Sequence, residues 1–302
     1  QGFPSKPIRV ISPYAAGGGP DVQLRQASPV LGEILGQSIV IENKVGAAGV
    51  LAAQYVANQP ADGYTYLMGS NTHLIQKILI PTLKFDPIAE FSPVSNLTSS
   101  PVILVVSASS PYKTAAELMD DIKAKPNTFN YGSGGIGTSA HLAGATFASI
   151  GGLKVTHIPL RGSVEITASI IRGDTVYACP VAGTAMPQIT GGKLRALAVS
   201  SRARLPQLPD VPTLQEVLKN ELAVQESWFG IWAPAKTDPS TLNMLNQAIQ
   251  KVVATPSVKT AFEAAANVAV SSPSPAEFAK FVRSENVKWA EIVKLAGVTV
   301  TS

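Results

Sequence analysis

The sequence predicts an α/β fold of two domains with mostly parallel sheets, and three observations support this prediction. Short β-branched runs alternate with helical patterns almost throughout the chain, which is typical of strand–helix–strand units. The chain has 302 residues, more than one hydrophobic core usually serves. Its composition changes near residues 97–101 and again at 204–213, which is rich in proline. We therefore expect domain one to comprise 1–99 and 224–302, and domain two 100–223.

Eight segments are predicted as strands because they are rich in β-branched residues and bounded by turn residues. They are 8–12, 39–42, 65–69, 102–107, 129–132, 155–158, 175–178 and 195–199. The aromatic run 228–232 has alternating large side chains, so we expect a half-buried strand there. Residues 97–101 are small and polar, and we expect them to form a connector.

Apolar residues recur with a helical period at 22–35, 48–58, 115–124 and 139–150. After residue 232 the pattern is almost only helical. Several helix starts fit a capping box, in which a hydroxyl residue precedes a glutamate by three positions. These pairs are Thr114 with Glu117, Thr213 with Glu216, and Ser274 with Glu277; Asp238 before Pro239 is another predicted start.

The composition excludes several classes of protein. Apolar residues make up 45% of the chain and charged residues 15%, which is typical of a well-packed globular protein and not of a disordered one. The net charge is only +4 and the basic residues are scattered, so we expect no nucleic-acid partner. The sequence contains no run of about 18 consecutive apolar residues, the length that a membrane-spanning helix needs. The chain opens at Gln1 without a charged-then-apolar leader, as a trimmed chain would. Its one cysteine, Cys179, lies in an apolar run, so we expect a buried, inert thiol and no cysteine-based metal site.

Two glycine-rich turns, 13–21 and 131–139, are the candidate functional segments. Each follows a predicted strand and precedes a predicted helix. A helix start has unpaired N–H groups and the positive end of the helix dipole, so it holds anions without a cationic side chain. Glycine lets the backbone approach a ligand closely. Two such turns therefore suggest a carboxylate held from two sides.

Enzymatic alternatives have weaker support. Residues 135–140 fit a loose dinucleotide fingerprint, but the acidic residue expected about 20 positions later is absent, since Glu165 is the nearest downstream. A nucleotide-binding enzyme that uses the Gly135–Gly137 turn remains an alternative. Neither serine completes a nucleophile elbow, because Tyr131 stands two places before Ser133 and His141 two places after Ser139. The three histidines lie far apart in sequence. We expect no catalytic residues, no enzyme activity and no cofactor.

At these residues the chain resembles the solute-binding proteins of tripartite tricarboxylate transporters, often called the Bug family. The resemblance runs nearly from end to end and includes both glycine turns. The matching segments, in chain order, are 7–11, 13–21, 41–49, 60–65, 131–144, 192–199 and 208–213.

The resemblance implies a type II periplasmic-binding-protein-like fold, with two α/β domains joined by a hinge and a ligand cleft between them. It also implies a periplasmic protein that captures a small carboxylate and delivers it to the small and large membrane subunits of its transporter. We expect a monomer without a cofactor. A ligand-sensing partner of a signalling receptor is an alternative, because the sequence does not separate the two roles.

The resemblance further implies which residues bind the ligand. In the family, both turns bind a carboxylate through backbone amides, hydroxyls and ordered waters. Carried onto this chain, the ligand-binding residues are Tyr14, Ala15, Ala16, Gly17, Gly18, Gly19, Ser70, Asn71, Thr72, His73, Ser133, Gly137, Thr138 and Ser139. Asp21 also matches the family pattern. From its position we favour a structural role, receiving N–H groups at the first helix start, over ligand contact.

Two departures from the family pattern concern the ligand. Arg161 stands where relatives commonly have a lysine, and its planar fork suits a second, distal carboxylate. The alternative is a surface ion pair with Glu165. Pro180 and Val181, followed by Ala182 and Gly183, replace a polar pair and would leave one wall apolar. Together with the ring of Tyr14, these residues favour a hydrophobic dicarboxylate, including aromatic ones such as terephthalate, over citrate or an amino acid.

Overall fold

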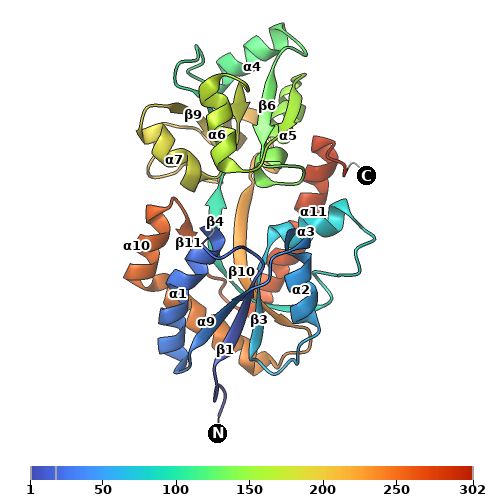
Figure 1. Cartoon of the computed structure of the whole chain (residues 1–302), viewed down its shortest axis with the longest axis vertical. Coiled ribbons are helices and arrows are strands. Elements are labelled where there is room, and N and C mark those ends of the chain that lie inside the picture. Colours follow the sequence, from blue (N-terminus) through green and yellow to red (C-terminus); the bar gives the residue numbers. More distant parts are fainter. Residues whose placement is uncertain (1, 18, 301–302) are drawn as a thin grey trace. The chain divides into compact units, whose positions relative to one another are not determined.

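The computed structural model describes residues 2–17 and 19–300 and divides the chain into two compact units (Figure 1). Unit 1 contains the residues up to Ser99 and Trp228–Trp289; unit 2 contains Ser100–Ser227 and the residues from Ala290 on. The chain therefore passes from one unit to the other three times. The second crossing follows Ser227, where the sequence predicts it after residue 223.

Unit 1 is built on a six-stranded mixed sheet. Strands β1, β2 and β3 are parallel, so their carboxyl ends meet at one edge of the sheet. Strand β10 is antiparallel to β3, and β11 is antiparallel to β4. In spatial order the strands are β11 (Val268–Ala269), β4 (Phe91–Pro101), β10 (Glu226–Pro234), β3 (Thr65–Ser70), β1 (Ile8–Ser12) and β2 (Ile39–Asn43).

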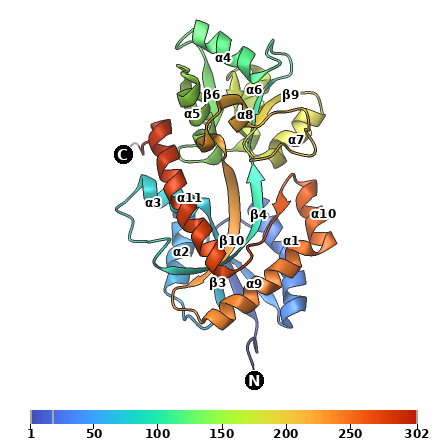
Figure 2. The same cartoon turned by 180° about the vertical axis from the view of Figure 1, so that it is seen from behind.

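Helices cover both faces of this sheet. Figures 1 and 2 show α1, α9 and α10 together on one side and α2 and α3 on the other. The long helix α11 begins in unit 1, and its last residues belong to unit 2. The bounds are α1 Gly19–Leu35, α2 Val50–Ala57, α3 Asn71–Leu79, α9 Pro239–Ala254, α10 Pro256–Ala264 and α11 Pro275–Ala296; the short 3-10 turn η1, Ala47–Gly49, precedes α2.

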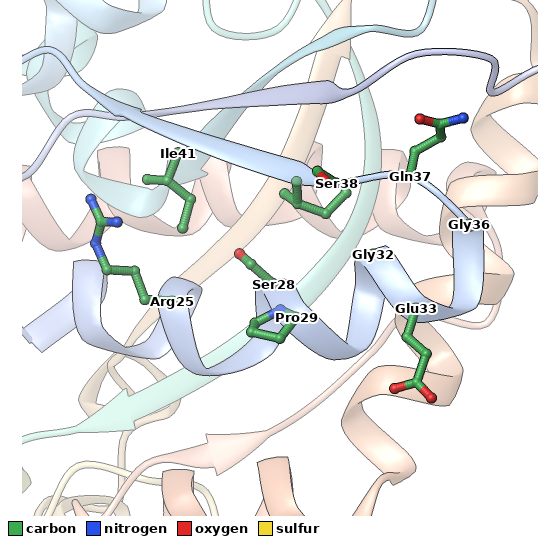
Figure 3. Close-up of a pocket in the computed structure, with 10 residues that line it drawn as sticks. Arg25, Ser28, Pro29, Gly32, Glu33, Gly36, Gln37, Ser38 and Ile41 are labelled. Carbon is green, nitrogen blue, oxygen red and sulfur yellow. The ribbon is translucent and has the colours of Figure 1, made fainter.

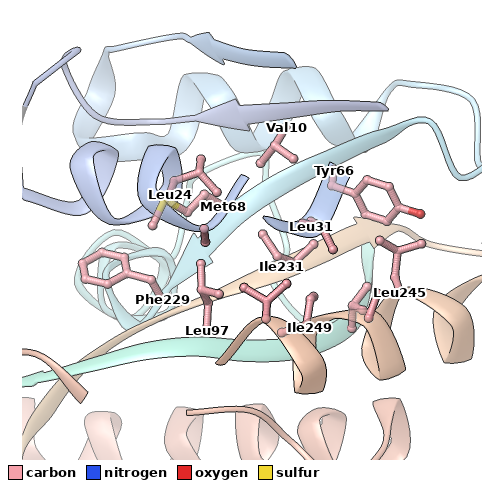
Figure 4. Packing of buried hydrophobic residues seen from close by; sticks show 14 of the residues in the cluster. Val10, Leu24, Leu31, Tyr66, Met68, Leu97, Phe229, Ile231, Leu245 and Ile249 are labelled. Carbon is pink, nitrogen blue, oxygen red and sulfur yellow. The ribbon is translucent and has the colours of Figure 1, made fainter. Parts of the chain in front are cut away.

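The main core of unit 1 lies between the sheet and the helices α1, α9 and α10 (Figure 4). Leu24 and Leu31 of α1 and Leu245 of α9 pack against strand side chains such as Met68 and Ile231, and each of these five is at most 6% exposed. The apolar faces of these helices recur at helical spacing, which is why the sequence folds onto the sheet in this way.

Unit 2 contains a five-stranded sheet. Strand β6 is parallel to β7 and β8, whereas β5 is antiparallel to β8 and β9. The strands in spatial order are β7 (Thr156–Pro159), β6 (Asn130–Ser133), β8 (Tyr177–Ala178), β5 (Ile103–Ser107) and β9 (Leu194–Val199). The other elements are α4 (Ala115–Ala124), α5 (Ser139–Gly151), α6 (Ser163–Arg172), α7 (Ala182–Thr190), α8 (Leu214–Leu218) and the 3-10 turn η2 (Glu221–Ala223).

The predicted strands overlap observed strands, but two expectations were wrong. Residues 97–101 belong to β4 and are not a connector. Their small polar side chains are buried: Thr98 is fully buried, and nearby Ser95 Oγ accepts a hydrogen bond from Ser272 N at 2.9 Å. The aromatic run of β10 is fully buried, not half-buried, with Trp228 2% and Trp232 0% exposed. Strand β10 lies inside the sheet with both faces covered.

In the described part of the chain, no helix is both long and apolar enough to cross a membrane.

Candidate functional site

The first glycine turn lies beside the start of α3, because β1 and β3 are parallel neighbours. The hydroxyl of Tyr14 and Ser70 Oγ are 3.1 Å apart, with Tyr14 donating. The ring of Tyr14 packs edge-on against Phe229, with centroids 5.4 Å apart. Burial raises the pKa of Tyr14 to about 12, although hydrogen bonds to Ser70 and Thr72 act in the opposite direction. Tyr14 therefore remains a neutral hydroxyl on an apolar ring.

Asp21 holds the first turn in place. Gly17 adopts a left-handed conformation (φ +85°), and its N–H donates to Asp21 Oδ2 at 3.0 Å. Asp21 is fully buried and also accepts hydrogen bonds from Arg25 at 2.8 Å and from Asn43 at 2.6 Å. Burial alone would raise the pKa of Asp21, but these three donors lower it below its usual value. The carboxylate is thus charged and engaged by partners within unit 1.

Other predicted residues of this turn are placed differently. Ala15 and Ala16 are exposed. Gly19 is the first residue of α1. Gly18 lies outside the described residues.

The segment Ser70–His73 forms the start of α3. Ser70 Oγ accepts from Thr72 N at 3.2 Å, and His73 Nδ1 accepts from Ser70 N at 3.1 Å. His73 Nε2 lies 3.1 Å from the carbonyl oxygen of Gly49, so the ring carries its proton on Nε2. Asn71 Oδ1 accepts from Trp228 N at 3.3 Å. Both nitrogens of His73 and the side-chain oxygen of Asn71 therefore serve hydrogen bonds inside unit 1.

The second glycine turn links β6 to α5 in unit 2. Ser133 Oγ accepts from Gly135 N at 3.1 Å, and Thr138 Oγ1 donates to Gly135 O at 2.7 Å. Gly137, also left-handed (φ +83°), donates its N–H to His141 Nδ1 at 3.1 Å. The first intrahelical bond of α5 runs from Leu142 N to Thr138 O, so the preceding N–H groups point out of the helix end. The hydroxyl of Ser139 is bonded to that of Ser227.

Two more helix starts lie at the same edge of the unit 2 sheet, because β7 and β8 are parallel to β6. Leu160 N donates to Ser133 O at 2.7 Å, which joins the loop after β7 to the second glycine turn. Helix α6 begins after Gly162 and α7 after Val181, and neither start has a side-chain capping bond. Three helix starts thus present backbone N–H groups along one sheet edge, as in known anion sites.

Arg161 forms the ion pair that the sequence offers as the alternative to ligand contact. Its Nε lies 3.4 Å from Glu165 Oε2, and its backbone N–H donates to the same oxygen at 2.9 Å. The side chain of Arg161 is 94% exposed. At the α7 start, Ala182 is fully buried and Gly183 is exposed.

Sequence reasoning missed a column of rings beneath the second turn. His141 and His157 are stacked with centroids 3.8 Å apart, and His157 Nε2 lies 2.5 Å from Ser133 Oγ. The ring of Tyr131 also packs against His157, with centroids 5.2 Å apart. Burial lowers the pKa of His141 to about 4, with a further contribution from His157. The pairing of β6 with β7, which sets Tyr131 opposite His157, brings these distant residues together.

A groove of about 720 Å³ lies elsewhere on unit 1, between α1 and β2 (Figure 3). Its lining includes Arg25, Ser28, Glu33 and Ile41. Neither glycine turn contributes to this groove, and the carboxylate of Glu33 would repel an anionic ligand. We therefore assign the candidate site to the helix starts and not to this groove.

The described residues, 2–17 and 19–300, contain no group of three or more histidine, cysteine or acidic side chains that could hold a metal ion. Cys179 is fully buried, and burial raises the pKa of its thiol to about 12. A thiol with this pKa is a poor nucleophile at neutral pH.

Comparison with known proteins gives one consistent family. The model of the tripartite tricarboxylate transporter family receptor (TctC) matches residues 23–298. The protein BugT of Bordetella pertussis is 30% identical over 297 residues, which cover 98% of this chain and 90% of BugT.

Solved structures agree with this match and confirm the predicted fold class. The periplasmic binding protein BugD superposes with a TM-score of 0.79 at 27% identity, covering 98% of this chain and 99% of BugD. An R. palustris protein solved with adipate gives a TM-score of 0.83 at 28% identity and covers 99% of both chains. MatC from Rhodopseudomonas palustris with bound malate gives 0.78 at 29% identity, covering 96% of this chain and all of MatC.

Proposed function

The chain belongs to the tripartite tricarboxylate transporter receptor family, and on this premise we propose that it binds a small carboxylate in the periplasm and delivers it to the membrane subunits of a transporter. The family is one of solute-binding receptors and not of enzymes. This assignment leaves no role for the nucleotide-dependent enzyme considered above.

We propose that backbone N–H groups of both glycine turns and of the adjoining helix starts bind the carboxylate, with the hydroxyls of Thr72 and Thr138 beside them. The main supporting observation is the set of helix starts in unit 2: α5, α6 and α7 begin at one sheet edge, and α6 and α7 have no side-chain cap. Such N–H groups favour an anion through both hydrogen bonding and the helix dipole. In unit 1, the exposed residues Ala15 and Ala16 of the first glycine turn are the proposed source of matching N–H groups.

We further propose a dicarboxylate with an apolar body. Support comes from the ring of Tyr14, which lies against Phe229, and from the apolar start of α7 at Val181 and Ala182. The R. palustris protein solved with adipate gives further support, because adipate is a diacid whose two carboxylates are joined by an apolar chain. Arg161 is the proposed contact for the second carboxylate, in competition with its ion pair to Glu165.

Calorimetric titration of the purified protein with adipate, terephthalate, malate, citrate and aspartate tests this proposal. We expect saturable binding, with adipate or terephthalate tightest because their apolar bodies suit the apolar wall. Tighter binding of citrate or aspartate would contradict the dicarboxylate assignment. No binding by any of these acids would contradict the carboxylate function itself.

The same titrations on Arg161→Ala test the second carboxylate contact. We expect about tenfold weaker binding of the preferred diacid, because an exposed charge-assisted contact is worth little more than 1 kcal/mol. Benzoate, with one carboxylate, should bind the variant and the wild type equally. Arg172→Ala is a matched control, since Arg172 lies at the opposite end of α6 from Arg161 and also forms an exposed ion pair, with Asp174. Equal loss for benzoate and the diacid would remove Arg161 from the ligand set.

A further inference from the structure

The capped helix starts of this chain differ in the third residue of the helix. At α4, α8 and α11 a hydroxyl residue is followed three positions later by glutamate: Thr114 with Glu117, Thr213 with Glu216, and Ser274 with Glu277. In each pair the hydroxyl accepts the backbone N–H of the glutamate. At α3 and α5, beside the proposed carboxylate site, the same position is a histidine: Ser70 with His73, and Thr138 with His141.

Each histidine accepts a backbone N–H at the entry to its helix, as Glu117 and Glu216 do at the starts of α4 and α8. In α8, Glu216 Oε2 accepts the N–H of Thr213 at 2.7 Å. In α3, His73 Nδ1 likewise accepts the N–H of the N-cap residue Ser70, at 3.1 Å. In α5, His141 Nδ1 accepts the N–H of Gly137, the residue before the N-cap, at 3.1 Å, just as Glu117 Oε2 accepts from Lys113 N at 3.0 Å in α4. The geometry of the helix start is therefore maintained in both cases. What differs is charge, since glutamate brings a negative charge to the helix start and a neutral imidazole does not.

Both imidazoles lie in surroundings that favour the neutral form. His73 is 1% exposed and packs against the rings of Phe85 and Trp232, with centroids 6.1 and 5.6 Å away. His141 is 6% exposed and stacked on His157 at 3.8 Å, so a proton on either ring would repel one on the other. The remaining titratable groups of this column are the phenols of Tyr131 and Tyr177, which are neutral.

Acids do occur near other helix starts of the candidate site, but each is balanced by an arginine four residues away. Asp21, in the first turn of α1, pairs with Arg25 at 2.8 Å. Glu165, in the first turn of α6, pairs with Arg161 at 3.4 Å. The helix starts at the site therefore carry a neutral acceptor or a paired acid. As long as Arg161 stays paired with Glu165, a bound carboxylate meets no unbalanced negative charge at these starts.

We propose that His73 and His141 are positioning residues of the carboxylate site: each fixes a helix start through a backbone hydrogen bond while adding no negative charge there. This proposal rests on the proposed function, since it assigns a role in the same site. It does not require either ring to touch the ligand.

Four variants separate hydrogen bonding from charge: His73→Gln, His73→Glu, His141→Gln and His141→Glu. Glutamine keeps a neutral acceptor, whereas glutamate keeps the acceptor and adds a charge. We expect calorimetry with adipate and malate to show the glutamine variants within about threefold of the wild type and the glutamate variants at least tenfold weaker, because a like charge at one helical turn is poorly screened.

Glu216→Gln provides the matched control, because it changes the charge of a capping box at α8, whose start contributes nothing to the proposed site. Its affinity for the same acids should equal that of the wild type. We expect each glutamate variant to melt below its glutamine partner, since a charge is unfavourable at these buried positions. Affinities are therefore compared at a temperature at which both variants are folded, where a purely structural role would give equal affinities within the pair. Equal affinities of glutamine and glutamate variants would overturn the role of the histidines.

The outcomes of these titrations separate a failure of the proposed function from a failure of the histidine role. If the wild type binds no carboxylate, the proposed function fails and the histidine role falls with it, whereas equal variant affinities overturn only the histidine role. If a glutamate variant does not fold, ¹⁵N NMR of histidine-labelled wild type replaces it. We expect Nδ1 of His73 and His141 to be unprotonated at pH 7; protonation of both ring nitrogens there would overturn the proposal.

Discussion

His73 couples the stability of unit 1 to pH. Both of its ring nitrogens are bonded to backbone groups, and burial lowers its pKa from 6.5 to about 4. Between these two values the unfolded chain binds more protons than the folded one, so the free energy of unfolding falls as the pH falls. The stability is fully present above pH 6.5 and its loss is complete near pH 4.

We therefore predict that His73 contributes a loss of about 3 kcal/mol in the free energy of unfolding between pH 7 and pH 4. Urea unfolding of the wild type and of His73→Gln, at both pH values, measures this contribution as the difference between the two pH dependences. Other titrating groups are common to the two proteins and cancel. Parallel pH dependences would contradict the prediction.

The sequence alone could assign a structural or binding role to some residues but not to others. The glycines of both turns follow from their position between a strand and a helix, and left-handed Gly17 and Gly137 fit that reading. The role of Asn43 could not be predicted, because its hydrogen bonds to Tyr14 O and Asp21 Oδ1 depend on the pairing of β2 with β1. The two helix-start histidines did leave a signal, a hydroxyl residue three positions earlier, but a search restricted to glutamate passes over it.

Among the elements, β10 and α11 are joined by one buried acid. Glu285 of α11 is 7% exposed, and its Oε1 accepts from Trp228 Nε1 at 2.6 Å and from Trp289 Nε1 at 3.3 Å. The ring of Trp228 also packs edge-on against Phe278 and Phe281 of the same helix. One carboxylate thus satisfies two buried indole groups at once.

Glu285→Ala should lower the free energy of unfolding by about 3 kcal/mol, because it leaves two buried N–H donors without their acceptor. Glu285→Gln keeps a carbonyl acceptor and should cost about 1 kcal/mol. Urea unfolding followed by tryptophan fluorescence measures both. Glu291→Ala, an exposed position on the same helix, should change stability by less than about 0.5 kcal/mol. Equal effects at 285 and 291 would show that the two indole bonds contribute nothing.

Strands and helices with a clear periodic pattern of apolar residues could be predicted from the sequence. The segments that were predicted wrongly have identifiable physical causes. The strand β1 and the helix α4 have the predicted bounds, since β-branched runs and a capped apolar face specify them locally. Strand β4 was missed because its polar residues resemble a loop until Ser272 and the neighbouring strand supply their partners. The burial of β10 depends on helices far along the chain, so the alternation of its aromatic residues suggested a half-exposed strand instead.

At the scale of the whole molecule, each unit contains its own intrinsic probe. All three tryptophans, Trp228, Trp232 and Trp289, belong to unit 1, whereas the only cysteine, Cys179, belongs to unit 2. Tryptophan fluorescence therefore follows the unfolding of unit 1. The rate at which a thiol reagent modifies Cys179 follows the opening of unit 2, because the folded unit buries that thiol completely.

We predict that the preferred diacid raises the urea midpoint of both probes, because each unit contains one of the two glycine turns proposed to bind carboxylate. At a ligand concentration of 100 times the dissociation constant, the stabilisation is about 2.7 kcal/mol. Benzenesulfonamide, a neutral aromatic compound, serves as the control and should shift neither midpoint. A shift of the fluorescence midpoint alone would restrict the carboxylate contacts to unit 1, and a shift of thiol reactivity alone would restrict them to unit 2.

The complete burial of Cys179 has a practical consequence for labelling. Maleimide dyes react with accessible thiolates, so the folded wild-type chain should take up almost none. A cysteine introduced at an exposed position such as Val164 or Val45 then becomes the single attachment point for a fluorophore, without prior removal of the native thiol. The natural sequence can thus serve directly as the background for an optical sensor of its own solute.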